Sequence, residues 1–281
     1  MARRLAVGCR SVKFSKWQGL GNHYVIVERA ELPLEIDGGV ARRICDPNLG
    51  VGGDGILEIA FEGATPRMIV WNPDGSNAES CGNGIRMVAR YLALNDLLPS
   101  DGIIQTGAGP VRAEVLDDHR VRVEMGPARF PAGERTESLG VGAQQIEFAE
   151  VSMGNPHAVI VHADPASVVR VLGPSIEVDP RFPDRTNVEF IRVDGPGELT
   201  MRVWERGVGE TMACGTGACA AAVAAVRLCA VESPVTVHLL GGDLVIEVDQ
   251  EDLSVTMTGG ADPIFEGRLS EPILRSFGGA Q

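Results

Sequence analysis

The chain has 281 residues, 44% hydrophobic and 22% charged, so it can bury the core of one large domain or of two domains of ordinary size. Its formal net charge of -13 argues against a nucleic-acid footprint and against binding to anionic membranes. Residues 1–12 carry basic side chains but lack the apolar segment of a signal peptide, and no long apolar run predicts a membrane span. We therefore expect residues 1–12 to be an N-terminal extension, and the protein to be cytoplasmic with reduced thiols.

Four strands and one helix are predicted in the first half of the chain. Two of the strands are short apolar runs bounded by turn-forming residues, and two alternate apolar with polar side chains. In chain order they are residues 24–27, 68–71, 111–115 and 121–125. The helix begins at the Gly-rich sequence after Cys81, and we expect it to end near Asn95. The Gly-rich segment 50–55 lacks the Gly-Lys-Ser/Thr ending of a phosphate-binding loop, so we interpret it as a turn into the following strand.

The second half of the chain repeats this order at a constant spacing of 133 residues. The matched dipeptides are Gly21-Asn22 with Gly154-Asn155, Asp46-Pro47 with Asp179-Pro180, Val70-Trp71 with Val203-Trp204, Cys81-Gly82 with Cys214-Gly215, and Glu114-Val115 with Glu247-Val248. Strands are again predicted at residues 158–161, 201–204, 244–248 and 253–257. A second helix is predicted from the sequence after Cys214 to about Ala230. We infer two copies of one domain, residues 14–130 and 147–265, joined by a polar, Gly-rich linker over residues 131–146.

The helix of the second copy is small and apolar on every face, which predicts burial on all sides. Small side chains also let the surrounding strands approach closely. The sequence therefore predicts an α+β fold of two homologous domains. Each domain is expected to be a curved, mostly antiparallel, barrel-like sheet wrapped around a central helix, with the active site in the cleft between the domains.

Two of the six cysteines, Cys81 and Cys214, hold the same place in the two copies, just before the Gly-x-Gly entry into each helix. A helix start offers unpaired N–H groups and a partial positive charge, which stabilise a thiolate, lower a thiol pKa and bind carboxylates. Each Cys-Gly-x-Gly is therefore a candidate acid/base with its own anion cradle. The other four cysteines are interpreted as small buried hydrophobic residues. They are Cys9, Cys45, Cys219 and Cys229.

Two such sites can face each other across a cleft, with a thiolate and a thiol on opposite sides of one carbon atom. The thiolate removes the α-proton and the thiol returns a proton to the other side, which inverts the stereocentre. The sequence shows no pyridoxal-type lysine motif, no dinucleotide fingerprint and no cysteine spacing typical of zinc, so we expect no cofactor and no metal. These residues predict a cofactor-independent amino-acid racemase or epimerase.

Polar residues flank the two cysteines at matched positions. The corresponding pairs are Asn22 with Asn155, Asn72 with Glu205, and Asp54 with Asn187. A single loop asparagine is commonly turn chemistry, but its repetition beside both cysteines favours a functional role. His157 and Glu205 are candidates for relaying protons or adjusting thiol pKa values. The alternatives are a structural histidine and a surface ion pair between Glu205 and Arg206.

Seven motifs together resemble the diaminopimelate epimerase family, over nearly the whole chain from Phe14 to about Phe265. They are Gly19-Leu20-Gly21-Asn22, Asn72-Pro73-Asp74-Gly75-Ser76, Cys81-Gly82-Asn83-Gly84, Gly154-Asn155-Pro156-His157, Thr186-Asn187-Val188, Glu205-Arg206-Gly207 and Ala213-Cys214-Gly215-Thr216-Gly217-Ala218. The resemblance implies that the chain interconverts LL- and meso-2,6-diaminopimelate in lysine biosynthesis. It also implies a homodimer that uses neither cofactor nor metal.

By the same resemblance, Cys81 and Cys214 are the catalytic acid/base pair, and His157 and Glu205 adjust the thiol pKa values. The residues implied to hold the α-carboxylate at the helix starts are Gly82, Asn83, Gly215 and Thr216. The other residues implied to bind substrate are Asn22, Asn72, Asn155, Asn187, Glu205 and Arg206.

The sequence departs from the family at three places. It has His23-Tyr24 where the family commonly has Asp-Phe, and Ala158 where a cysteine is common. Gly55 stands where some members have a glutamine that touches the substrate. None of these changes removes a candidate catalytic residue, and Gly55 bears on recognition of the distal end of the substrate.

Three other functions compete with this interpretation. A proline or histidine racemase would keep the mechanism, but proline racemases lack the Glu205-Arg206-Gly207 pattern. An isomerase that uses a single carboxylate lacks the paired cysteines. A non-catalytic protein that binds small molecules would need the cleft but not two reactive thiols. In every case we expect a small-molecule ligand and neither nucleic acid nor membrane as a partner.

Overall fold

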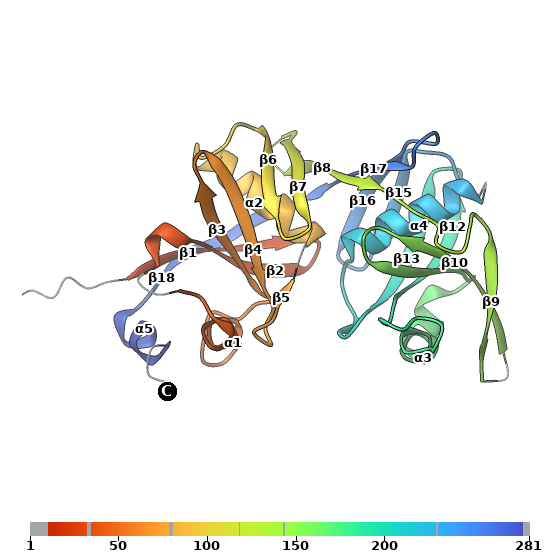
Figure 1. Cartoon of the computed structure of the whole chain (residues 1–281), viewed down its shortest axis with the longest axis horizontal. Coiled ribbons are helices and arrows are strands. Elements are labelled where there is room, and N and C mark those ends of the chain that lie inside the picture. The colour runs from red at the N-terminus through yellow and green to blue at the C-terminus, as the bar shows by residue number, and fades with distance from the viewer. Residues whose placement is uncertain are drawn as a thin grey trace, which may run out of the picture.

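The computed structural model describes residues 11–32, 35–78, 81–117, 119–142, 144–228 and 230–277. Most of the expected N-terminal extension, together with Cys9 and Cys229, lies outside the described residues. The chain forms two lobes that lie side by side (Figure 1). Within the described ranges, no helix is both long and apolar enough to cross a bilayer.

The two lobes are built from nearly the same order of elements; the first has an additional 3-10 helix and the second an additional strand at its start. The first contains β1 (Val12–Gly19), β2 (Asn22–Glu28), η1 (Arg29–Glu31), α1 (Gly38–Cys45), β3 (Ile56–Glu62), β4 (Thr65–Trp71), β5 (Asn77–Ala78), α2 (Gly82–Leu94), β6 (Asp101–Thr106), β7 (Gly109–Val115) and β8 (Arg120–Pro127). The second contains β9 (Thr136–Val141), β10 (Gln144–Ser152), β11 (Pro156–Val161), α3 (Pro165–Glu177), β12 (Asn187–Gly195), β13 (Glu198–Glu205), β14 (Gly209–Glu210), α4 (Gly215–Arg227), β15 (Val235–Leu239), β16 (Gly242–Val248) and β17 (Ser254–Gly260). The chain then returns to the first lobe as β18 (Asp262–Leu269) and α5 (Glu271–Phe277), at the left of Figure 1.

The eight strands predicted from the sequence are confirmed as β2, β4, β7, β8, β11, β13, β16 and β17. The repeat is confirmed too, because α2 and α4 begin and end 133 residues apart, as do β7 and β16. The second helix ends at Arg227, three residues before the expected end. The N–H of Ala230 donates to the carbonyl of Ala225, a bond between residues five apart that closes a helix end. The alanine- and valine-rich sequence contains no residue that predicts the end of the helix at Arg227.

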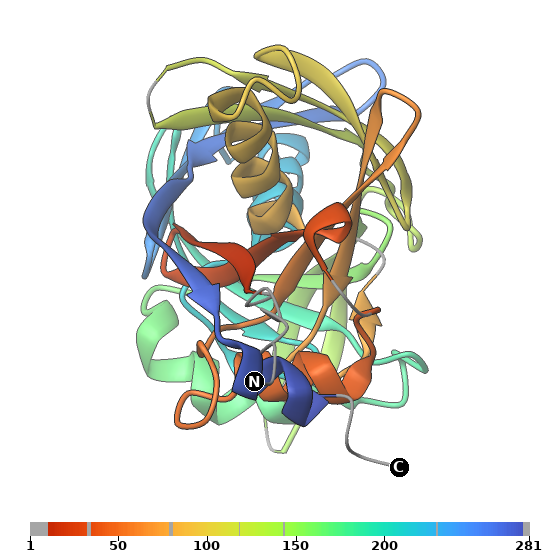
Figure 2. The same cartoon turned by 90° about the vertical axis from the view of Figure 1, so that its left-hand side faces the viewer.

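The strands form one continuous 18-stranded sheet that curls around a helix in each lobe. The first part pairs in the order β18, β1, β2, β3, β4, β6, β7 and β8. The second pairs in the order β17, β16, β15, β13, β12, β11, β10 and β9. Strands β8 and β17 pair with each other and join the lobes, as Figures 1 and 2 show. Most pairs are antiparallel, and the described strands do not close into a barrel.

The segment expected to link the two copies also carries secondary structure. Residues 131–146 include β9 and the start of β10, which pair as a hairpin. The C-terminal strand β18 pairs with β1 of the first lobe. This pairing satisfies the backbone groups along the edge of β1, which would otherwise be exposed. The exact domain boundaries of 14–130 and 147–265 remain a prediction.

The two enclosed helices form the centre of the core. Residues 217–226 of α4 are all buried, which confirms the burial predicted from its composition. Residues 83–92 of α2 are buried as well, and they include the charged side chains of Arg86 and Arg90. Arg90 pairs with Asp262 of β18 at 2.7 Å. Smaller apolar clusters lie under α1 and α5 in the first lobe and under α3 in the second.

Candidate active site

The two candidate cysteines are the N-cap residues of the enclosed helices. Cys81 Sγ accepts a hydrogen bond from the N–H of Gly84 at 3.2 Å. Cys214 Sγ accepts one from the N–H of Gly217 at 3.4 Å. Each sulfur thus takes the place of the oxygen that usually caps a helix, and it satisfies one of the unpaired N–H groups there.

The two helix starts meet at the junction of the lobes. A Cβ placed on Gly82 would lie 3.5 Å from Cα of Gly215, and a Cβ on Gly215 would lie 3.5 Å from Cα of Gly82. Met257 of β17 touches both positions. Two residues that are 133 positions apart in sequence are therefore in backbone contact.

The second glycine of each motif leaves room for the thiol. A Cβ on Gly84 would come within 3.2 Å of Cys81 Sγ, and a Cβ on Gly217 would come equally close to Cys214 Sγ. A Cβ on Gly217 would also lie 2.7 Å from Oε1 of Glu189. A Cβ contact of 3.2 Å is tighter than most and one of 2.7 Å is essentially never seen, so a side chain would crowd the sulfur at both positions and would also collide with Glu189 at position 217.

Burial sets the ionisation of both thiols. Burial raises the pKa of Cys81, although the Tyr24 hydroxyl and the N–H of Gly84 act in the opposite direction. The pKa of Cys214 lies well above its usual value because of burial and then because of the carboxylates of Glu205 and Glu189. The expectation that a helix start yields a low thiol pKa is therefore wrong for this structure. The N–H donors do lower the pKa, but removal from water outweighs them.

The candidate asparagines form equivalent contacts in the two copies. Asn83 donates from Nδ2 to Asn22 Oδ1 at 3.0 Å. Asn155 donates from Nδ2 to Thr216 Oγ1 at 3.3 Å. Both contacts join the asparagine of the Gly-Asn dipeptide to the second residue of the helix. The structure thus brings together four predicted site residues in two matched pairs.

His157 lies behind the second helix start and does not contact the thiol directly. Its Nδ1 lies 2.7 Å from Glu189 Oε1, and its Nε2 lies 3.1 Å from Asn155 Oδ1. His157 and Glu189 are fully buried, and Oε2 of Glu189 has no hydrogen-bond partner. Glu205 contacts Cys214 directly; burial raises the pKa of Glu205, while hydrogen bonds with Thr211 and Cys214 oppose that rise.

Asn187 and Arg206 are joined to each other. Asn187 accepts the N–H of Arg206 at 3.0 Å and donates to the carbonyl of Pro156 at 2.9 Å. At the matching position of the first copy, Asp54 accepts the N–H of His23 at 2.8 Å. Pro156 stands where the first copy has His23, and proline has no N–H to donate. The second copy therefore has the amide of Asn187, which donates to the Pro156 carbonyl, in place of the accepting carboxylate of Asp54.

Asn72 and the Arg206 side chain lie apart from this cluster. Asn72 donates to Ser76 Oγ at 3.0 Å within its own turn. The Arg206 side chain is exposed and donates to the carbonyl of Asp184 at 3.2 Å. The hydrogen bonds of Asn72, of Asn187 and of the Arg206 side chain do not join them to the helix starts.

Three residues at the site were not predicted from the sequence: Tyr24, Arg86 and Glu189. Tyr24 Oη lies 3.4 Å from Cys81 Sγ. Arg86 donates to Asn83 Oδ1 at 2.8 Å, and complete burial lowers its pKa to about 10. A charged residue inside an otherwise apolar segment is a usable signal, and both Arg86 and Glu189 show it in the sequence. The signal for Tyr24 was that it stands where the family commonly has phenylalanine.

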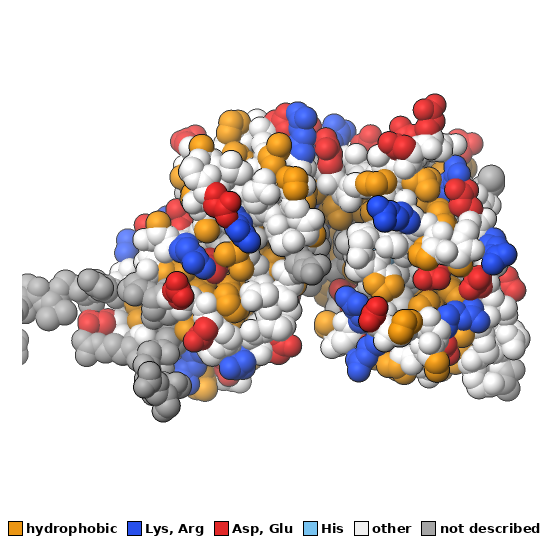
Figure 3. All heavy atoms as spheres, viewed as in Figure 1, with side chains coloured by type: hydrophobic (Ala, Val, Ile, Leu, Met, Phe, Trp, Pro, Cys, Tyr) orange, Lys and Arg blue, Asp and Glu red, His pale blue; other side chains and the backbone are white. Residues whose placement is uncertain are grey.

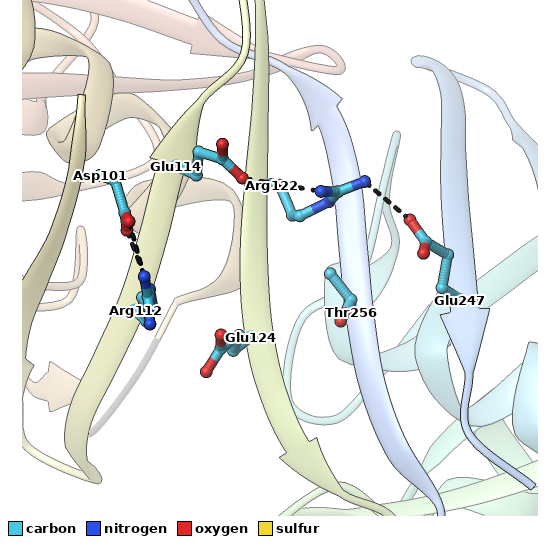
Figure 4. Close-up of a pocket in the computed structure, with 7 residues that line it drawn as sticks. All are labelled: Asp101, Arg112, Glu114, Arg122, Glu124, Glu247 and Thr256. Carbon is cyan, nitrogen blue, oxygen red and sulfur yellow. Dashed lines mark hydrogen bonds and ion pairs between the residues drawn. The ribbon is translucent and has the colours of Figure 1, made fainter.

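Two surface hollows in the described part of the chain are lined by neither cysteine nor histidine. Figure 3 shows a notch between the lobes and charges of both signs over their surfaces. One hollow lies across β6, β7, β8, β17 and β16, and its charged side chains other than Glu124 pair with one another (Figure 4). Examples are Asp101 with Arg112 at 2.6 Å and Arg122 with Glu247 at 3.2 Å. In the described part of the chain, no group of three or more His, Cys, Asp or Glu side chains is arranged to hold a metal ion.

Solved structures similar to this chain share its fold at low sequence identity. A probable proline racemase from Agrobacterium radiobacter matches with a TM-score of 0.69 and 17% identity, over 94% of this chain and 95% of that chain. A phenazine biosynthesis protein of the PhzF family from Bacillus anthracis matches with a TM-score of 0.69 and 16% identity, over 92% of this chain and 99% of that chain. The chain therefore belongs to one class of fold, the two-domain fold of these proline racemase and PhzF structures.

Sequence comparison places the chain within that class. The sequence profile of diaminopimelate epimerase matches residues 14–131 and 149–264. A diaminopimelate epimerase from Desulforudis audaxviator is 46% identical over 92% of this chain and 99% of its own length. Another, from Pelotomaculum thermopropionicum, is 44% identical over 90% of this chain and 97% of its own length. The chain belongs to the diaminopimelate epimerase family, which confirms the resemblance inferred from its motifs.

Proposed function

We propose that the chain interconverts LL-2,6-diaminopimelate and meso-2,6-diaminopimelate, in lysine biosynthesis, by a two-base mechanism without a cofactor. One observation carries the proposal: the two copies of the family's domain place Cys81 and Cys214 at helix starts that touch. A substrate carbon held there has one sulfur on each side. That arrangement suits inversion of a stereocentre.

In the proposed reaction, one cysteine begins as a thiolate and the other as a thiol. The thiolate takes the α-proton, and the electron pair of the C–H bond stays on the α-carbon. The other thiol then gives its proton to the opposite face, so the two cysteines exchange their protonation states. No proton or electron is gained or lost overall.

The charge that develops at the α-carbon spreads into the α-carboxylate, and that group is best held by the helix starts. The residues proposed to hold it are Gly82, Asn83, Gly215 and Thr216. Unpaired N–H groups and the partial positive charge of the two helices stabilise the extra negative charge as it forms. The contacts of Asn22 with Asn83 and of Asn155 with Thr216 keep these positions fixed.

The remaining predicted roles divide between the two sides of the site. Glu205 is proposed to adjust the pKa of Cys214 directly, because it contacts that thiol. His157 is proposed to act through Glu189 and Asn155. The residues proposed to bind the rest of the substrate are Asn22, Asn72, Asn155, Asn187, Glu205 and Arg206. Exposed Arg206 is suited to reach a carboxylate at the distal end.

We also propose, from family resemblance, that the protein is a cytoplasmic homodimer with a small-molecule substrate and neither nucleic acid nor membrane as a partner. Family membership weighs against the racemases, the carboxylate isomerase and the non-catalytic binding protein considered from the sequence.

The deciding experiment is incubation with LL-diaminopimelate in deuterium oxide, followed by NMR. We expect the α-hydrogen to exchange for deuterium as the meso isomer forms. Cys81→Ala is expected to abolish epimerisation, while Cys45→Ala, which changes a buried cysteine in α1, keeps it. Epimerisation by Cys81→Ala at the wild-type rate would show that the two-thiol mechanism is wrong.

A further inference from the structure

Tyr24 brings a hydroxyl to one of the two thiols. It lies on β2, its side chain is buried, and its Oη is 3.4 Å from Cys81 Sγ. Tyr24 also lies 133 positions before His157, so these two residues occupy one place in the repeated domain. Each copy therefore presents a polar side chain from the same strand position toward its own half of the site.

The backbone around Tyr24 is adapted to its ring. A Cβ on Gly55 would lie 2.7 Å from Tyr24 Cε1 and 2.5 Å from the carbonyl oxygen of Trp71. A backbone oxygen cannot move away as the end of a flexible side chain can. A side chain at position 55 would therefore require this backbone and the ring of residue 24 to shift.

The phenol is the proton donor in its contact with an ionised Cys81. Burial raises the pKa of Tyr24 well above its usual value, and negative charge at Cys81, Asp54 and Glu205 acts in the same direction. Tyr24 therefore stays protonated at pH values where the thiol ionises. A hydrogen bond to the charged form of a group favours that form, so the phenol favours the thiolate.

The charged groups around the two thiols differ. Arg86 on α2 favours ionisation of Cys81, and Glu205 on β13 opposes it. Two carboxylates oppose ionisation of Cys214, Glu205 on β13 and Glu189 on β12. The hydroxyl of Thr216 and the N–H of Gly217 act in the other direction and favour ionisation of Cys214. A buried cation and a phenol thus face one thiol, and two carboxylates face the other.

We propose that Tyr24 is a positioning residue whose hydroxyl donates to Cys81 and makes Cys81 the first of the two thiols to ionise. The proton lost from Cys81 goes to solvent, and Cys214 keeps its proton. The inference rests on the function proposed above, because it assigns the resting base to Cys81 and the resting acid to Cys214. The stereoisomer whose α-hydrogen faces Cys81 then reacts with the resting enzyme directly.

The test measures the two thiols separately and needs no substrate. Wild-type protein is treated with iodoacetamide over a range of pH, and alkylation of Cys81 and Cys214 is counted by peptide mass spectrometry. The pH at half of the maximal rate gives each thiol's apparent pKa and does not depend on its exposure. We expect Cys81 to have the lower value; a lower value for Cys214 would overturn the proposal without any variant.

Tyr24→Phe removes the hydroxyl and keeps the ring. Phenylalanine is also the residue that the family commonly has at this position. We expect the apparent pKa of Cys81 to rise by about one unit, hence about tenfold slower alkylation of Cys81 below its pKa, with Cys214 unchanged. The acid limb of the kcat/KM profile should move in the same direction. It should do so equally for both stereoisomers, because the equilibrium constant between them is fixed.

Tyr91→Phe is the matched control, because Tyr24 and Tyr91 are the only tyrosines in the chain. Tyr91 lies on α2 and donates to Glu28 at 2.6 Å, so its loss should leave both thiols unchanged. The role of the hydroxyl would be refuted if the apparent pKa of Cys81 were unchanged in Tyr24→Phe, or if it shifted equally in both tyrosine variants. Since alkylation needs no turnover, absence of deuterium exchange would disprove the proposed function and leave this result interpretable.

Discussion

The tight contact at the second helix start gives a sharp test of the site geometry. In Gly217→Ala the new Cβ would lie 2.7 Å from Oε1 of Glu189. That oxygen cannot retreat, because His157 Nδ1 holds it at 2.7 Å and both side chains are fully buried. Overpacking costs about 1–3 kcal/mol. Disturbing a buried hydrogen bond of a charged group adds about 1–3 kcal/mol. The helix preference of alanine over glycine returns about 1 kcal/mol.

Gly84→Ala is the matched substitution in the first copy. Its Cβ would meet Leu57 Cδ2 at 2.8 Å; Leu57 is fully buried, but no hydrogen bond of a charged group is disturbed there. The overpacking cost less the helix preference then comes to about 0–2 kcal/mol. We expect Gly217→Ala to lose about 2 kcal/mol more in free energy of unfolding, measured by urea denaturation and circular dichroism. Equal losses, or the reverse order, would show that the buried pair is not held against the helix start.

Two further predictions concern charge and assembly. Glu205→Gln removes a negative charge that raises the pKa of Cys214, so the half-maximal pH for alkylation of Cys214 should fall by about one unit; a rise would mean that the carboxylate does not act as a like charge. Light scattering at micromolar concentration should give twice the chain mass of 29.8 kDa, and a single chain mass would disprove the proposed homodimer.

The duplicated domain has kept its backbone and changed its charges. Residues at equivalent positions are Tyr24 and His157, Ile56 and Glu189, and Arg86 and Cys219. The helix starts they surround have the same bounds and the same sulfur cap. Repulsion between two close thiolates already favours a pair with one thiolate and one thiol, and the difference in charged neighbours decides which thiol ionises first.

The sequence alone determined the repeat, eight strands, both enclosed helices and the family. These features are local or periodic: alternation marks strands, an all-apolar run marks a buried helix, and a fixed spacing of 133 marks duplication. The pairing of Asn22 with Asn83 and of Asn155 with Thr216 also follows the repeat once the fold is known.

Only the tertiary structure decided how the thiols ionise and what surrounds them. A motif shows that Cys81 and Cys214 begin helices, but their pKa values depend on loss of water and on charges from distant strands. Glu189 and Tyr24 reach the thiols from β12 and β2, and no local pattern encodes those contacts. The return of β18 to the first lobe is likewise a long-range pairing, because an exposed strand edge can be satisfied by any strand of suitable register. Burial and long-range contact are properties of the folded chain, so the sequence located the two cysteines and the fold set their chemistry.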